Sequence, residues 1–171
     1  MPIFRKKQST AKPSASPLTI HLMVDEGTFD EGTGDVSFDG FWPYLDLGCT
    51  RRMPFDELCP DEPRVFYSNV AGVSFHAGQL QLSCFDVGQV VALVPEPTNT
   101  ADTNAIQVVG SIGKRMYPTG YVPAPIARQL AGVAQGQTGQ GIVVQTFSKG
   151  GARVGLRIVG SFGRVLQAKS V

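Results

Sequence analysis

The chain has 171 residues, enough for one domain with a substantial appendage. Its 42% hydrophobic and 17% charged residues are too apolar for a disordered chain and too weakly charged for a coiled coil. No run approaches the roughly 18 apolar residues of a membrane helix, so we expect no membrane association. The basic N-terminus lacks the apolar core of a secretory signal, and three widely spaced cysteines suit a reducing, cytoplasmic location.

Charge is distributed in blocks along the chain. Residues 1–20 carry a net +4, residues 21–62 carry −9, and residues 63–171 carry +6. From residue 103 onward there are eight basic residues and no acidic one. A basic domain attracts polyanions, because neutralised phosphates release counterions. Charge therefore favours a nucleic-acid partner, and a solvated basic face without a partner is the alternative.

Composition divides the chain into three segments. We expect a basic flexible tail over 1–18, an acidic N-terminal extension over 19–62 and the main domain over 63–171. The apolar run TIHLMV at 19–24 predicts a first strand.

The rest of the extension reads as a loop followed by an aromatic patch. Residues 25–40 are rich in Gly and Asp, which predicts a loop with a hairpin tip near 32–34. The sequence FWPY at 41–44 is expected to pack on the main domain, with contact to a ligand as the alternative.

The main domain is predicted to be mainly β. Short runs rich in Val, Ile, Leu and Phe recur between Gly, Pro, Asn and Asp residues, which indicates a small barrel or meander of strands. Residues 125–131 have the apolar spacing of a helix, with Pro125 in its first turn and Gly132 at its end. The predicted strands are VFYSNVAGVSF (65–75), LQLSCF (80–85), QVVALV (89–94), NAIQVVGSI (104–112), GIVVQTF (141–147) and RVGLRIV (153–159).

Motifs for catalysis, metals and cofactors are missing from the sequence. There is no phosphate-binding GxxxxGK[ST] motif and no dinucleotide-binding GxGxxG in a strand–helix context. The cysteines and histidines lack the paired spacing of zinc ligands, so we interpret the thiols as structural. We expect no cofactor, no metal and no enzymatic activity; these ligand candidates are Cys49, Cys59, Cys84, His21 and His76.

Three elements of the main domain resemble the HIRAN domain family. The first is G-x-x-[FY]-[HY]-x-G at 72–78, and the second is L-x-x-E-P-x-N-x-x-D-x-N-A-I at 93–106. The third is G-[YH]-[VL]-P-x-x-x-A at 120–127, at the start of the predicted helix. All three occur in order at suitable spacing, and the second is the most specific.

The resemblance implies a small OB-like or SH3-like β-barrel with one or two short helices. HIRAN domains occur in fork-remodelling helicases, where they bind single-stranded DNA and capture its free 3′-OH end. They also occur alone in bacterial and phage proteins, which this chain resembles because it has no helicase segment. A recognition module is implied, with a helicase or other repair protein as a further partner.

The resemblance also implies roles for individual residues. Phe75 falls where the family has an aromatic residue that stacks on a terminal base, and His76 follows it. Asn99, Asp102 and Asn104 fall in the end-capture loop, where a carboxylate can accept a hydrogen bond from a 3′-hydroxyl. For each the simpler interpretation stays open: Phe75 fills the core, and the loop residues cap their own turn.

Other positions match or depart from residues that contact DNA in other members of the family. Tyr121 resembles a phosphate-contacting residue of DNA-binding members. Three positions depart from those members: Ser74 and Ala124 replace basic residues, and Ala101 replaces an aromatic one. From charge and sequence proximity alone, we expect the lost phosphate contacts to be replaced by Lys114, Arg115 and Arg128.

The sequence therefore predicts a non-catalytic module that binds single-stranded DNA, including its 3′-OH end, in DNA repair or replication. The alternative is a protein-interaction module on the same barrel. A small hydrolase or nuclease is disfavoured, because the matched region contains no paired carboxylates or metal cluster.

Overall fold

The described residues form two sheets and one complete helix. The computed structural model describes residues 16–23, 36–40, 42–46, 50–73, 85–149 and 152–170. The helix is α3 (Ala124–Ala134). Within the described residues, no helix has the length and hydropathy needed to cross a membrane.

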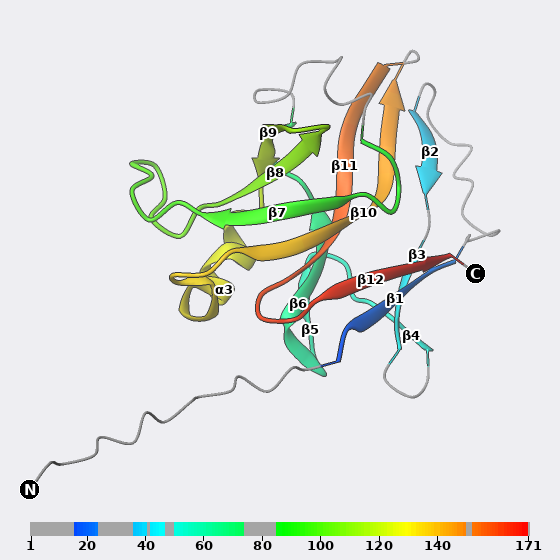
Figure 1. Cartoon of the computed structure of the whole chain (residues 1–171), viewed down its shortest axis with the longest axis horizontal. Coiled ribbons are helices and arrows are strands. Elements are labelled where there is room, and N and C mark those ends of the chain that lie inside the picture. The colour runs from blue at the N-terminus through cyan, green and yellow to red at the C-terminus, as the bar shows by residue number, and fades with distance from the viewer. Residues whose placement is uncertain are drawn as a thin grey trace, which may run out of the picture.

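The larger sheet has eight strands, and all of its strand pairs are antiparallel. Seven of them follow the order β5-β6-β11-β10-β7-β8-β9, and β2 joins at β10 (Figure 1). The strands are β2 (Val36–Gly40), β5 (Glu57–Cys59), β6 (Glu62–Asn69), β7 (Val90–Pro95), β8 (Ile106–Ile112), β9 (Arg115–Tyr121), β10 (Gly139–Lys149) and β11 (Ala152–Ser161).

The path of the larger sheet curves until its far parts touch. Ala71, two residues after β6, forms an isolated bridge with Tyr121 at the end of β9. The two residues exchange backbone hydrogen bonds of 2.8 and 2.9 Å. The predicted mainly β class is confirmed, whereas full closure into a barrel stays a prediction, because a single bridge joins these ends within the described residues.

The smaller sheet covers the outside of the larger one. Its order is β12-β1-β3-β4, with β1 parallel to β12 and antiparallel to β3. Figure 1 shows the first and last of its strands in sequence, β1 and β12, side by side. The strands are β1 (Leu18–Met23), β3 (Trp42–Asp46), β4 (Thr50–Arg52) and β12 (Leu166–Ser170).

Two hydrophobic cores lie on opposite faces of the central strands. One contains side chains from β6, β7, β8, β10 and β11 together with the buried face of α3. The other joins alternate side chains of β6, β10 and β11 to β1 and β12. Because both faces are covered, consecutive residues 65–68 of β6 are all buried. The second core includes Leu18, Ile20, Leu22, Val65, Tyr67, Ile142, Val144, Val159 and Leu166.

Helix α3 packs one apolar face on the first core. Its buried residues are Ile126, Ala127, Leu130 and Ala134, which share one face at helical spacing. Pro125 lies in the first turn, as predicted, where its missing N–H has no cost. The helix continues through the predicted stop at Gly132 and ends at Ala134. The left-handed residue that follows it is Gly136, with φ of 72°.

The predictions for the loop at 25–40 and for the set of strands also differ from the structure. The predicted loop 25–40 is wrong for its last five residues, which form β2 and pair with β10. This pairing is available because β10 is 11 residues long and β7 pairs only with its first part, at 139–142. The sequence also did not predict β3, β4, β5, β9 and β12. The predicted strand 80–85 lies outside the described residues except for Phe85.

Candidate functional site

The segment between β7 and β8 forms a compact loop. The N–H of Glu96 donates to the carbonyl of Ala105 at 2.8 Å, which continues the pairing of the two strands past their ends. Inside this pair, the N–H of Asn99 donates to the Glu96 carbonyl at 2.9 Å, and that of Ala105 to the Asp102 carbonyl at 2.9 Å. The loop over 96–105, which we call the EP loop, is therefore a closed turn with fixed ends.

Side chains of the EP loop hold its backbone in place. The Oδ1 atom of Asn99 accepts hydrogen bonds from the backbone N–H of Ala101 at 3.0 Å and of Asp102 at 3.2 Å. The Oδ1 atom of Asp102 accepts one from the N–H of Asn104 at 2.9 Å. The turn-capping interpretation of Asp102 and Asn104 is correct for Asp102, whereas within the described residues the Asn104 side chain makes no hydrogen bond. Asn99 caps the turn as well. The part of the chain that the structure describes gives Oδ2 of Asp102 no hydrogen-bond donor.

Glu96 links the EP loop to β9. Its Oε2 atom accepts hydrogen bonds from Nδ2 of Asn99 at 3.1 Å and from the Tyr121 hydroxyl at 3.0 Å. Gln107 on β8 donates through Nε2 to the Tyr121 hydroxyl at 3.4 Å. The Glu96 carboxylate thus joins the EP loop to β9, and the Tyr121 hydroxyl extends this network to β8.

The role of Glu96 was missed by sequence reasoning, although the residue lies in the matched motif. A signal was present. Residues 63–171 contain only three acidic residues, and two of them, Glu96 and Asp102, lie in the EP loop. In a basic segment, a retained carboxylate at the end of an apolar strand marks a place where a fixed acceptor is needed.

A glycine brings Tyr121 against the chain that follows β6. Gly120 has φ of 155°, and a Cβ atom there would lie 2.3 Å from the Ala71 carbonyl oxygen. Only glycine permits this approach. The bridge between Ala71 and Tyr121 therefore brings residues 71–73 beside the EP loop's partner strand. Phe75 and His76, with Ser74, lie outside the described residues.

The predicted basic residues lie at different distances from the EP loop. Lys114 and Arg115 are exposed at the turn between β8 and β9, where Gly113 has φ of 60°. Arg115 and Tyr121 are at opposite ends of β9, so they lie about 20 Å apart at roughly 3.3 Å per residue. Arg128 is exposed on α3, seven residues after Tyr121.

These three cations are unpaired, in contrast to two others. Nothing in the described parts of the chain gives Lys114, Arg115 or Arg128 a salt bridge or a side-chain hydrogen bond. Arg157 instead donates to Asn69 at 2.8 Å and to Gln145 at 2.7 Å, and its guanidinium lies 4.4 Å from the centre of the Phe55 ring. Arg164 pairs with Glu62 at 2.7 Å. Part of the positive charge of residues 63–171 is thus used inside the fold.

Comparison with known proteins agrees with the motif and its geometry. The family model of the HIRAN domain matches residues 63–162, which is more than half of the chain. The chain belongs to the HIRAN domain family. The match contains the EP loop, Tyr121 and α3, and it leaves β1, β2, β3, β4, β5 and β12 of this HIRAN protein outside.

Among solved structures, the crystal structure of the HIRAN domain of human HLTF is similar to this chain. The two share 21% identity, and the alignment covers 57% of this chain and 75% of the other, with a TM-score of 0.39. No curated protein matches the chain.

Proposed function

We propose that this HIRAN protein binds single-stranded DNA without catalysis and that Asp102 accepts a hydrogen bond from the 3′-hydroxyl of the strand. The observation that carries the proposal is the EP loop of a HIRAN domain, in which hydrogen bonds within the loop hold the backbone and the Asp102 carboxylate. The biological processes this implies, DNA repair or replication, rest on the family resemblance.

The state of Asp102 supports a role in recognising a hydroxyl. One carboxylate oxygen is engaged by the N–H of Asn104, which fixes the side chain. The other has no donor within the described residues and can accept one from a ligand. A 3′-hydroxyl offers such a donor, whereas a 3′-phosphate brings negative charge to the same carboxylate and is repelled. A fixed acceptor with one free oxygen therefore distinguishes the two kinds of end.

The unpaired cations support the sequence-independent part of binding. Lys114, Arg115 and Arg128 are exposed and free to approach phosphates, which position a strand without reading its sequence. Their spread over the turn between β8 and β9 and over α3 suits a backbone that crosses the surface. The alanines at 101 and 124 remove contacts that other members make, so we expect modest affinity with strong salt dependence.

A second candidate function is the interaction with a protein on the same domain. Val90 on β7 and Met116 on β9 are 51% and 59% exposed and offer apolar surface to a protein partner. This candidate predicts binding that does not depend on Asp102 or on salt.

The experiment is fluorescence anisotropy with single-stranded DNA that ends in either a 3′-hydroxyl or a 3′-phosphate, at two salt concentrations. We expect Asp102→Ala to reduce the preference for the 3′-hydroxyl end at least several-fold, while affinity for the 3′-phosphate end is unchanged or rises. Glu57→Ala is the matched control, because it removes one exposed carboxylate from β5, away from the EP loop. Thermal melting verifies that each variant is folded.

Two results would contradict the proposal. If a folded Asp102→Ala variant binds the 3′-hydroxyl and the 3′-phosphate strand with equally reduced affinity, Asp102 is a purely structural residue. Affinity that is negligible at low salt for every DNA would reject DNA binding and favour the protein-interaction candidate.

A further inference from the structure

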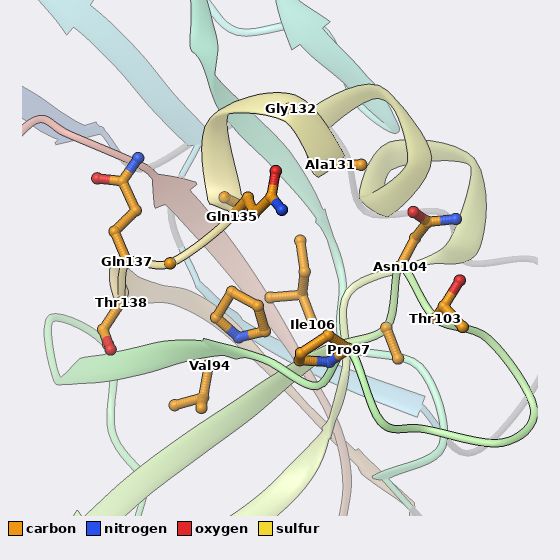
Figure 2. Close-up of a pocket in the computed structure, with 14 residues that line it drawn as sticks. Val94, Pro97, Thr103, Asn104, Ile106, Ala131, Gly132, Gln135, Gln137 and Thr138 are labelled. Carbon is orange, nitrogen blue, oxygen red and sulfur yellow. The ribbon is translucent and has the colours of Figure 1, made fainter.

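A pocket of about 590 Å³ lies beside the EP loop, and no function has yet been assigned to it. It is bounded by the end of β7, by the second half of the EP loop, by the last turns of α3 and by the connection from α3 to β10 (Figure 2). Its volume lies within the range of about 300–1,000 Å³ that is typical of small-molecule sites. It is therefore large enough for a heterocyclic ring.

The chemistry of the pocket is neutral. Among the described residues that line it, none carries a charge. Apolar surface comes from Ile106 and Pro97, in the middle of the view in Figure 2, and from Val94 below them. Without a cation, the pocket cannot compete with the exposed Lys114 and Arg115 for a phosphate. The part of a ligand that enters the pocket is therefore expected to be uncharged.

Amide groups stand at the edges of this apolar floor. Figure 2 shows the side chains of Asn104 and Gln135 on opposite sides of the pocket, with Ile106 and Pro97 between them. Within the described residues neither side-chain amide makes a hydrogen bond, whereas the amide of Gln137 is engaged with the Val133 carbonyl. An amide offers a donor and an acceptor together, as the edge of a nucleobase does.

From these features we propose that the pocket binds an unpaired nucleobase of the strand whose 3′ end is held at Asp102. This inference rests on the proposed function and adds a base site to it. A nucleobase is flat, uncharged, apolar on its faces and polar at its edges, which matches an apolar floor between two amides. A base packed on an apolar surface needs no sequence match, because every base has such a face.

The chain connects the pocket to the end-reading carboxylate. Thr103 and Asn104, which line the pocket, directly follow Asp102. Two residues of chain span at most about 7 Å, so Asp102 and the pocket wall lie within the reach of neighbouring nucleotides. The N–H of Asn104 also donates to the carboxylate of Asp102, so filling the pocket and occupying the end site act on the same turn.

The first test uses uncharged deoxynucleosides and needs no DNA binding. Thymidine and deoxyadenosine are titrated into the full chain while the side-chain amide resonances of Asn104 and Gln135 are followed by NMR. We expect saturable shifts of both resonances and none for Gln129, which lies on α3 outside the pocket. Ala131→Leu, which fills the pocket with a good helix former, is expected to weaken these shifts at least tenfold. Gln129→Leu is the matched control on the same helix.

The second test uses a short 3′-hydroxyl strand in which one of the last three nucleotides is abasic. We expect one abasic position to weaken binding about fivefold or more, because without that base the apolar floor of the pocket stays exposed to water. In the Ala131→Leu variant the same abasic position is expected to have no further effect, because the pocket is already closed.

The outcomes separate this inference from the proposed function. Strand binding that is unchanged by Ala131→Leu, without shifts of the Asn104 and Gln135 amides, overturns the base site and leaves end recognition standing. Nucleoside shifts in a chain that binds no strand reject the proposed function and leave a site for a free nucleoside. The base site on the bound strand is supported by nucleoside shifts in the first test together with weaker binding of the abasic strand in the second. Both effects should be lost in Ala131→Leu and kept in Gln129→Leu.

Discussion

The EP loop and the smaller sheet are built by opposite means. In the EP loop, polar side chains bond to backbone groups two or three residues away, and the longest contact, from Tyr121 to Glu96, spans 25 residues. In the smaller sheet, Leu18 pairs with Leu166, and buried apolar side chains join the two ends of the chain. One region is held by local hydrogen bonds and the other by burial of distant strands.

The difference determines what each region can do. Local hydrogen bonds fix the direction of single atoms, which a recognition loop needs. Burial of apolar side chains is not directional, but it contributes the larger part of the free energy of folding. The smaller sheet therefore stabilises the domain. We therefore expect the smaller sheet to control unfolding of the whole chain and the EP loop to control binding.

The largest effect is expected from Ile20→Ala on β1. Ile20 is 0% exposed in the second core, so its truncation should lower the free energy of unfolding by about 2–5 kcal/mol in urea titrations. Thr19→Ala, on the opposite face of the same strand, should change it by less than about 0.5 kcal/mol. A loss below about 1 kcal/mol for Ile20→Ala would show that the smaller sheet contributes little to global stability.

An intermediate effect is expected from Glu96→Ala. The change leaves the Tyr121 hydroxyl and the Asn99 amide without their acceptor, which costs about 1–3 kcal/mol. Hydrogen exchange should accelerate at the N–H groups of Ala101 and Asp102 and remain slow in β6 and β11.

Glu96→Gln sharpens this test, because its amide oxygen can replace Oε2 as the acceptor. We expect a loss of only about 0.5–1 kcal/mol, from weaker bonds to a neutral group. If both substitutions destabilise equally, the negative charge, and not the position of the oxygen, is what the EP loop requires.

The smallest effect is expected from Arg164→Met. Arg164 bonds to Glu62 at 2.7 Å and to the Ser16 carbonyl at 3.4 Å, near the start of β1. The ion pair is partly exposed, so its loss should cost about 1 kcal/mol or less, and the cost should shrink in high salt. A cost above that of Ile20→Ala would mean that polar contacts, not burial, hold the smaller sheet.

The sequence predicted the elements whose signals are local. Strand β8 and helix α3 carry their own apolar periodicity, and Asn99 and Asp102 cap backbone N–H groups two or three residues further along the chain. The family motif then located the site.

What could not be predicted depends on partners far along the chain. Residues 36–40 alternate apolar and polar side chains for only five residues within an acidic, Gly-rich stretch, and they form a strand because β10 has a free edge more than 100 residues later. The contact of Glu96 with Tyr121 likewise requires the pairing of β7 with β8 and of β8 with β9, which brings the two residues together from 25 positions apart. Both features depend on tertiary contacts, and a local sequence pattern carries no information about such contacts.

The parallel pairing of β1 with β12 also sets an order of folding during synthesis. Strand β1 can pair with β3 soon after both leave the ribosome, but its other edge has no partner until residues 166–170 exist. At about 5–20 residues per second, the intervening 120 residues take on the order of ten seconds. For that time the nascent chain carries an open strand edge, which is a template for pairing with other chains. The last strand made therefore closes the edge of the first.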